Sequence, residues 1–205
     1  MKIARLLIAV LCCLSVASCI KQNDNSTSSE IAPKAAEANS LELQASIQEL
    51  MQAMVDPAAD SVWESVGATI TPKGVEERQP RSDEEWQQAR NGAIALIEST
   101  NLLAMKGRRM VPIGGKMLDE GSDGVLTADE AQKRLDAQHA MFAQFAIALR
   151  ESAKKMLVAV DAKDPKAMMD IGSEMDAICE SCHMTFWYPD QMTFSVQTSA
   201  SQSAK

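Results

Sequence analysis

Apolar side chains recur every three to four residues through most of the chain, which is the spacing that predicts amphipathic helices. A first helix is expected from Leu41, and its apolar stripe consists of Leu43, Ile47, Leu50 and Met54. The pair Asp56-Pro57 then favours a kink or a restart of this helix, because proline fits the first turn of a helix and disturbs its interior.

Three further helices are predicted from their start signals. Ser82 and Thr127 each precede a glutamate by three residues, which is the pattern of a capping box, and Pro165 suits a first helical turn. The helices are expected at about 82–106, 127–161 and 164–189. Aromatic residues make up only 4% of the chain and runs of β-branched residues are absent, so no strands are expected. The prediction is an all-α domain over residues 41–190, an up-down-up-down four-helix bundle.

Both ends of the chain differ from this domain. Residues 1–18 combine Lys2 and Arg5 with an uncharged apolar run, which is typical of a secretory signal peptide and too short for a stable membrane span. Residues 19–40 are polar without an apolar period and are interpreted as a flexible linker; residues 191–205 are interpreted as a disordered tail.

The stretch "VASC" that ends at Cys19 resembles the bacterial lipobox. This resemblance implies that Cys19 is acylated and becomes the mature N-terminus, which would anchor the domain to a membrane. An ordinary signal peptide cut nearby is the alternative. Ile20 follows the cysteine, and resemblance to Gram-negative lipoproteins then favours a periplasmic protein on the outer membrane.

Charge and cysteine content narrow the function. The chain has a net charge of -8, and loss of Lys2 and Arg5 with the signal peptide would make it -10. Such acidity argues against nucleic-acid binding and is compatible with basic partner proteins. With Cys19 acylated and the earlier cysteines removed, Cys179 and Cys182 are the thiols left in the domain, so a framework of disulfides is excluded.

The sequence "CESCH" carries the most specific chemistry. On a helix, Cys179, Cys182 and His183 share one face, because residues three and four apart are neighbours there. C-x-x-C-H is the attachment signature of a c-type haem. A redox dithiol would be expected in a βαβ setting, which the predicted elements of this chain lack. A structural zinc site needs four ligands, and His139 is the only histidine besides His183 that could complete one. A chance match is the remaining alternative.

With this motif at the end of a fourth helix, the chain resembles the class II c-type cytochromes, the cytochrome c-prime family. The resemblance covers residues 41–190 and rests on "CESCH" with the number and order of the helices; "LMQAMVDPAADSVWESVG" looks like a lipoprotein branch. It implies one covalent haem c held by Cys179 and Cys182, with His183 as the proximal iron ligand, and also redox partner proteins and a homodimer. "MTFWYPDQ" departs from typical members, in which a basic residue follows the motif.

The sixth iron position is, in that family, either open or filled by a methionine. Met51 lies about ten residues into the first predicted helix, at a height that suits a ligand. Met54, His139, an open site and, more weakly, Met105 and Met110 are the alternatives. A Met51/His183 pair would favour electron transfer, whereas an open site would bind nitric oxide or carbon monoxide. A haem-free lipoprotein is a third hypothesis, and no nucleophile-base pair suggests an enzyme.

Overall fold

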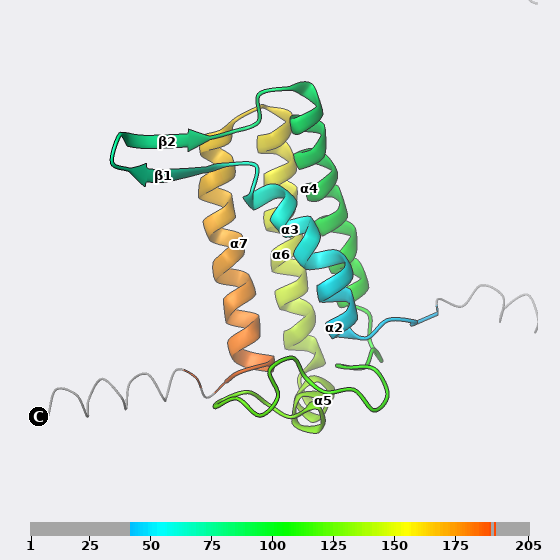
Figure 1. Ribbon diagram of the computed structural model, residues 1–205. Coiled ribbons are helices and arrows are strands. Elements are labelled where there is room, and N and C mark those ends of the chain that lie inside the picture. Colours follow the sequence, from blue (N-terminus) through cyan, green and yellow to red (C-terminus); the bar gives the residue numbers. More distant parts are fainter. Residues whose placement is uncertain (1–41, 190, 192–205) are drawn as a thin grey trace, which may run out of the picture. The chain divides into compact units, whose positions relative to one another are not determined.

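The computed structural model of the chain describes residues 42–189 and 191. Three long helices lie side by side: α4 (Asp83–Leu103), α6 (His139–Asp161) and α7 (Pro165–Phe186) (Figure 1). A shorter helical segment crosses in front of them and packs mainly on α4. The all-α prediction is confirmed at this level, apart from one small sheet. Within the described residues, no helix combines the length and apolar character needed to cross a membrane.

The first helical segment begins later than the sequence predicted. It consists of α2 (Ile47–Leu50), the π helix η1 (Met51–Val55) and α3 (Asp56–Trp63). The helix starts only at Ile47 because Ser46 is its N-cap. Carbonyl groups of the loop after α4 accept hydrogen bonds from the first backbone N–H groups of the helix. The Ile47 N–H donates to the Arg109 carbonyl at 2.8 Å, and the Gln48 N–H donates to the Met110 carbonyl at 3.0 Å.

Two of the predicted start signals lie where expected. The side chain of Ser82 accepts a hydrogen bond from the Glu85 N–H, and Glu85 bonds back to the Ser82 N–H, so α4 begins with a complete capping box. Asp164 caps α7 in the same way through the Ala167 N–H at 3.0 Å, with Pro165 in the first turn. These helices are fixed locally because a cap satisfies amides that have no partner within the helix.

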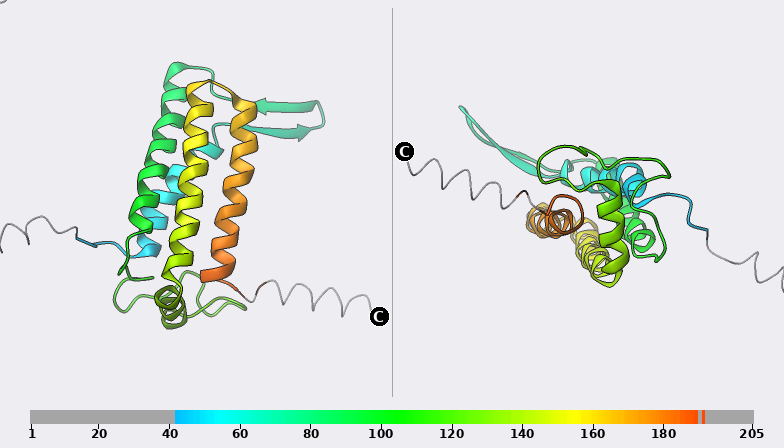
Figure 2. Two further views of the ribbon diagram at one scale, coloured as in Figure 1. Left: turned by 180° about the vertical axis from the view of Figure 1, so that it is seen from behind. Right: turned by 90° about the horizontal axis from the view of Figure 1, so that it is seen from below.

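The third predicted helix is in fact two. Thr127 and Glu130 form the expected capping box at the start of α5 (Ala128–Ala137), but the backbone leaves the helical region at Gln138 (φ -127°, ψ 28°), and α6 begins beyond it. The view from below shows α5 turned across the ends of the other helices (Figure 2). The buried residues Leu135 and Phe142 are seven apart, as in one straight helix, so the apolar pattern does not reveal the bend.

A β-hairpin between α3 and α4 corrects the expectation that no strands form. β1 (Gly67–Thr71) pairs antiparallel with β2 (Gly74–Arg78), and the hairpin projects sideways from the helices (Figure 1). Its apolar residues Ile70 and Val75 are 88% and 63% exposed. The usual sequence signal of a strand is an apolar face turned to a core, and this hairpin has none.

The core lies between α3, α4, α6 and α7, and its most completely buried side chains include Leu96, Met156, Met168, Met175 and Val62. Two glycines allow α3 to approach its neighbours. A Cβ on Gly92 of α4 would lie 2.8 Å from the Ser61 Oγ, and a Cβ on Gly172 of α7 would lie 3.2 Å from the Trp63 ring. The missing side chains therefore let the first helical segment lie close to both α4 and α7.

Candidate functional site

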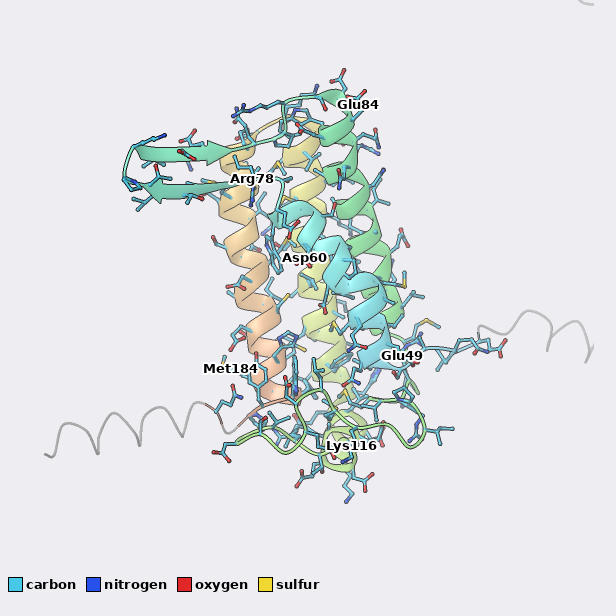
Figure 3. The ribbon with its side chains drawn as sticks, in the orientation of Figure 1. Glu49, Asp60, Arg78, Glu84, Lys116 and Met184 are labelled. Atoms are coloured by element: carbon cyan, nitrogen blue, oxygen red, sulfur yellow. The ribbon has the colours of Figure 1, made fainter. Side chains whose placement is uncertain are left out.

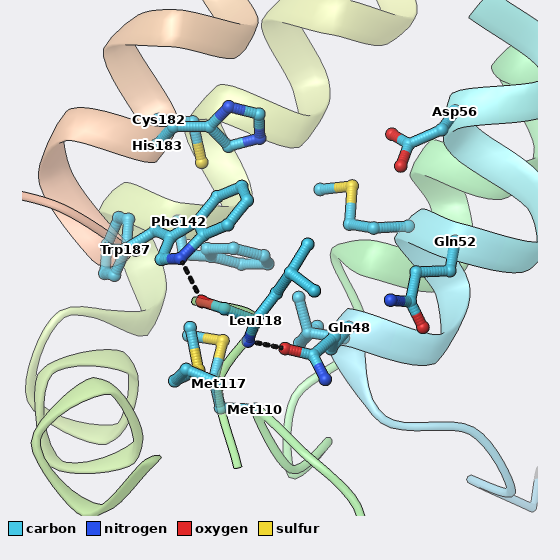
Figure 4. A pocket seen from close by; sticks show the side chains of 13 residues that line it. Gln48, Gln52, Asp56, Met110, Met117, Leu118, Phe142, Cys182, His183 and Trp187 are labelled. Atoms are coloured by element: carbon cyan, nitrogen blue, oxygen red, sulfur yellow. Dashed lines mark hydrogen bonds between the residues drawn. The ribbon is translucent and has the colours of Figure 1, made fainter. Parts of the chain in front are cut away.

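The motif cysteines and histidine lie in the last turns of α7, where all three side chains are half-buried. Cys179 and Cys182 are free thiols. Figure 4 shows Cys182 and His183 on one wall of a pocket, facing Gln52 and Asp56 on the first helical segment. The structure therefore brings the "CESCH" side chains onto one face, as predicted, and turns that face toward another element.

Two cavities meet at this wall. Including the space open to solvent at their mouths, the larger has a volume of about 860 Å³ and the smaller about 610 Å³. Five residues line both cavities: Met51, Asp56, Phe142, Cys182 and His183. Cys179 and Trp63 line the larger one, and Met117 and Trp187 line the smaller one.

Met51 reaches this site and Met54 does not. Met51 lines both cavities, whereas Met54 lines neither and packs against the core as a half-buried side chain. The stripe from Leu50 predicts Met54 as the next core position, but the buried residue is Val55, with 3% of its surface exposed. The buried positions after Leu50 are therefore shifted by one residue from those that regular α-helical spacing predicts, and the π helix causes this shift.

The π turn absorbs a phase difference between two buried faces. At about 100° per residue in an α-helix, the direction of Ile47 and Leu50 differs by about 100° from the mean direction of the later buried residues Val55, Ala58, Ala59 and Val62. One extra residue in a turn removes this difference. The Asp56 N–H accordingly donates to the Met51 carbonyl, five residues back. π turns are rare and frequently occur at functional sites.

The same turn aligns two side chains on the cavity. In an unbroken α-helix, Met51 and Asp56 would point about 140° apart. Because the π turn joins them by an i to i+5 hydrogen bond, both line the same cavities. Pro57 contributes to this geometry, since it has no N–H to offer the Ala53 carbonyl and its ring crowds that carbonyl.

Burial keeps the two thiols protonated. Desolvation raises the pKa of Cys179 to about 11, with the carboxylates of Asp176 and Asp56 adding to the effect. Desolvation also raises the pKa of Cys182 to about 12. Redox dithiols and nucleophilic cysteines instead depend on a lowered pKa. The raised pKa values argue against a redox dithiol at this site.

His183 is held in its neutral form. Burial lowers the pKa of its imidazole, and the nearby carboxylates of Glu180 and Asp56 oppose that shift without reversing it. A neutral imidazole is the form that ligates a metal ion. The ring also has close aromatic neighbours: Trp187 meets it edge-on with centroids 5.2 Å apart, and Tyr188 lies at 5.9 Å.

The aromatic residues after the motif close this end of the domain. Phe186 is buried and packs edge-on against Phe142, with centroids 5.3 Å apart. The Trp187 indole N–H donates to the Leu118 carbonyl at 3.0 Å, which ties the end of α7 to the long loop before α5. The Tyr188 hydroxyl donates to the Glu180 carboxylate at 2.6 Å. Together these contacts hold His183 in a fixed wall.

The other candidate ligands are placed differently. His139 is the first residue of α6 and lines neither cavity; its buried Nε2 has no hydrogen-bond partner among the described residues. Met105 also lines neither cavity and accepts a weak hydrogen bond from Arg108. Met110 is buried and lines the smaller cavity. Of the alternatives to Met51, only Met110 reaches the site.

Sequence reasoning missed several residues of the cavity walls. In the sequence, Asp56 signals only a helix break before Pro57, and its orientation depends on a π turn that the sequence analysis does not predict. Trp63 reaches the larger cavity because its indole N–H donates to the Gly172 carbonyl at 3.3 Å on α7. In the sequence, Phe142 and Met117 look like ordinary core residues. Only the structure shows that they line the cavities.

Comparison of the chain with protein-family models, curated proteins and solved structures finds no match. In the part of the chain that the structure describes, no group of three or more His, Cys, Asp and Glu side chains is arranged to hold a metal ion. The predicted signal peptide, the predicted linker with Cys19 as its expected acylation site, and the tail apart from Gln191 lie outside the described residues.

Proposed function

We propose that this chain is a mono-haem class II c-type cytochrome that transfers electrons. The observation that supports it most is the cavity wall formed by Cys179, Cys182 and His183, opposite Met51. The proposed architecture is the up-down-up-down four-helix bundle, with the first helical segment, α4, α6 and α7 as its members. The successive packing of α3 on α4, α4 on α6, and α6 on α7 supports this assignment.

The residues present suit such a cofactor. In the proposal, the thiols of Cys179 and Cys182 hold the haem covalently, His183 is the proximal ligand, and Met51 is the sixth ligand. A haem with histidine and methionine ligands supplies one-electron chemistry at a raised potential. Two unpaired thiols, a neutral imidazole and a thioether on facing elements are the donor set that this assignment requires.

The remaining walls govern solvent access and polarity. Phe142, Phe186 and Trp187 make the cavity wall beside His183 largely apolar, and an apolar shell is one of the factors that set a redox potential. No lysine or arginine is found among the described residues that line either cavity, whereas Asp56, Asp176 and Glu180 line the larger one. These carboxylates stabilise positive charge at the site, and at its mouth they suit a basic redox partner.

Gas binding is the second candidate. The larger cavity continues past Met51 and His183 to the apolar side chains of Leu103, Phe145 and Leu149. This space has room for a small neutral molecule beside the site, and nitric oxide or carbon monoxide would enter it if Met51 did not bind the iron. Neither candidate is an enzymatic activity.

For location, we propose a periplasmic protein attached through a lipid on Cys19, on the outer membrane. The signal-like residues 1–18 and the lipobox-like "VASC" support it. Redox proteins would be the soluble partners. Lipid attachment is tested by the mass of the mature N-terminal peptide and by Cys19→Ser, which should release the protein from membranes.

Covalent attachment tests the cofactor proposal. The full chain is expressed with its own signal in a bacterial host that matures c-type cytochromes, and the intact protein is weighed after acid denaturation. The proposal predicts the added mass of one haem, and a haem-stained band that persists in denaturing gels. The Cys179→Ser, Cys182→Ser double variant should lose both, with Ser181→Ala as the matched control on the same helix. A wild-type mass that lacks the added mass of one haem would refute the proposal.

A further inference from the structure

The β-hairpin lies at the opposite end of the domain from the haem-binding motif. Figure 3 shows Arg78 at the base of the hairpin, beside the upper part of α7, and Met184 near the lower, C-terminal end of the same helix. From behind, the hairpin again extends clear of the helices (Figure 2). A contact made through the hairpin would therefore leave the cavity end free for an electron-transfer partner.

Its apolar side chains have nothing to cover them in the described part of the chain. Ile70 and Val75 are directly paired across the two strands, on the same face, and are 88% and 63% exposed. Every residue of β2 is exposed. An isolated two-stranded hairpin is marginally stable in water, and additional strands or a packed helix are what stabilise one. A further strand would supply that support.

The two edges of the hairpin differ in charge. The β2 edge carries Glu76, Glu77 and Arg78, and charged residues of this kind protect an edge from pairing with other chains. The β1 edge reads Gly-Ala-Thr-Ile-Thr, without a charge or a proline, and three of its five residues are β-branched. The β1 edge is therefore the one open to a further strand.

We propose that β1 pairs antiparallel with β1 of a second copy of this chain, which makes a four-stranded sheet across a two-fold axis at Thr69. In that register, Ile70 of each copy lies opposite Ala68 of the other. Ala68, Ile70 and Val75 share one face because of the strand register, so pairing joins the two apolar patches into one strip. No charged residue opposes another across β1, whereas pairing through β2 about Glu76 would set like charges together.

A second copy fits this edge better than an unrelated protein does because the edge is complementary to itself. Two-fold contacts use the same patch on both subunits, and they are the commonest form of association. The contact lies away from the cavity and does not depend on the haem proposal. It also leaves the mouth of the cavity free in both copies.

Cross-linking tests the register. Thr69 and Glu76 are exposed partners across the hairpin and share one face, so Thr69→Cys and Glu76→Cys differ mainly in the strand that carries the thiol. Under mild oxidation, Thr69→Cys should give a disulfide-linked dimer on a non-reducing gel. Glu76→Cys and the wild-type chain, which controls for the native cysteines, should not. Equal cross-linking of both variants, or none of Thr69→Cys, would refute pairing through β1.

Association in solution tests the contact itself. Sedimentation velocity of the haem-loaded wild-type chain should show a monomer–dimer equilibrium, and Ile70→Glu should weaken it by at least about tenfold, because it puts a charge into the joined strip. Ile113→Glu is the matched control, since Ile113 is 87% exposed in a different loop. A wild-type chain that stays monomeric at high concentration, or equal effects of both substitutions, would overturn the proposal.

Discussion

The cavity has two walls built on different principles. α7 is a regular α-helix, so the spacing of Cys179, Cys182 and His183 along the chain gives their shared face directly. The first helical segment contains a π turn, so the face that presents Met51 also presents Asp56, which ordinary helical spacing would turn away. Helical spacing in the sequence therefore predicts which residues share a cavity wall only where the helix has no irregular turn.

Single-residue deletions should show the largest difference between a regular helix and the helical segment that contains the π turn. Deleting exposed Gln144 from α6 would rotate one half of a regular helix by about 100° relative to the other. Because both halves carry buried residues, we expect loss of cooperative unfolding. Deleting exposed Ala53 would instead convert the π turn to an α turn with both buried faces kept in register.

The Ala53 deletion should therefore leave a folded protein that loses about 3 kcal/mol or somewhat more, the typical cost of a proline inside an α-helix. Urea unfolding followed by circular dichroism measures both deletions. If the Ala53 deletion abolishes folding as completely as the Gln144 deletion does, the phase argument for the π turn is wrong.

Smaller substitutions in the first helical segment test which residue continues its core. Val55→Ala removes a side chain that is 3% exposed and should cost about 1–2.5 kcal/mol of unfolding free energy. Met54→Ala removes a larger but half-buried side chain and should cost less than about 1 kcal/mol. The opposite ranking in urea titrations would place the apolar stripe on Met54, where unbroken α-helical spacing puts it.

The smallest expected effect concerns Asp56. Partial burial raises the pKa of this carboxyl, with His183 opposing the shift, so the folded chain holds the proton more tightly than the unfolded chain does. Stability is then lost as the pH rises through the range from the unfolded pKa to the folded one. Asp56→Asn should be slightly more stable than wild type at pH 7, by a few tenths of a kcal/mol after solvent screening.

That advantage should disappear when the pH falls below the ordinary range of an aspartate. Asp60→Asn serves as the control on the same helix, and thermal unfolding at pH 7 and pH 3.5 gives the comparison. An advantage of Asp56→Asn that persisted or grew in acid would contradict the assigned direction of the pKa shift.

The sequence predicted the features that depend on neighbouring residues. The capping boxes at Ser82 and Thr127 lie where expected, and Pro165 lies in the first turn of α7, because such start signals involve only neighbouring residues. The shared face of the motif follows from one regular helix. Met51 has a height along the helix that suits a ligand, and the structure brings it to the cavity. Its role as an iron ligand stays a prediction.

What the sequence did not predict depends on distant contacts or on irregular backbone. The buried apolar residues on both sides of the bend at Gln138 keep the spacing of one continuous helix. The apolar pattern therefore does not reveal the bend. The hairpin exposes Ile70 and Val75 and therefore lacks an alternating core face. Asp56 reaches the cavity only through the π turn, which compensates for a mismatch between two buried faces that are set by packing on α4 and α7.

The most direct test of the account is the optical spectrum of the ferrous, haem-loaded protein with and without carbon monoxide, for wild type, Met51→Ala and Met54→Ala. The account predicts a sharp low-spin spectrum that carbon monoxide leaves unchanged for wild type and Met54→Ala. Met51→Ala should give a broad high-spin Soret band that shifts when the gas is added. A wild-type protein that is already high-spin and binds carbon monoxide, or a Met51→Ala variant with an unchanged spectrum, would contradict the assignment of Met51 and His183 as the two axial ligands.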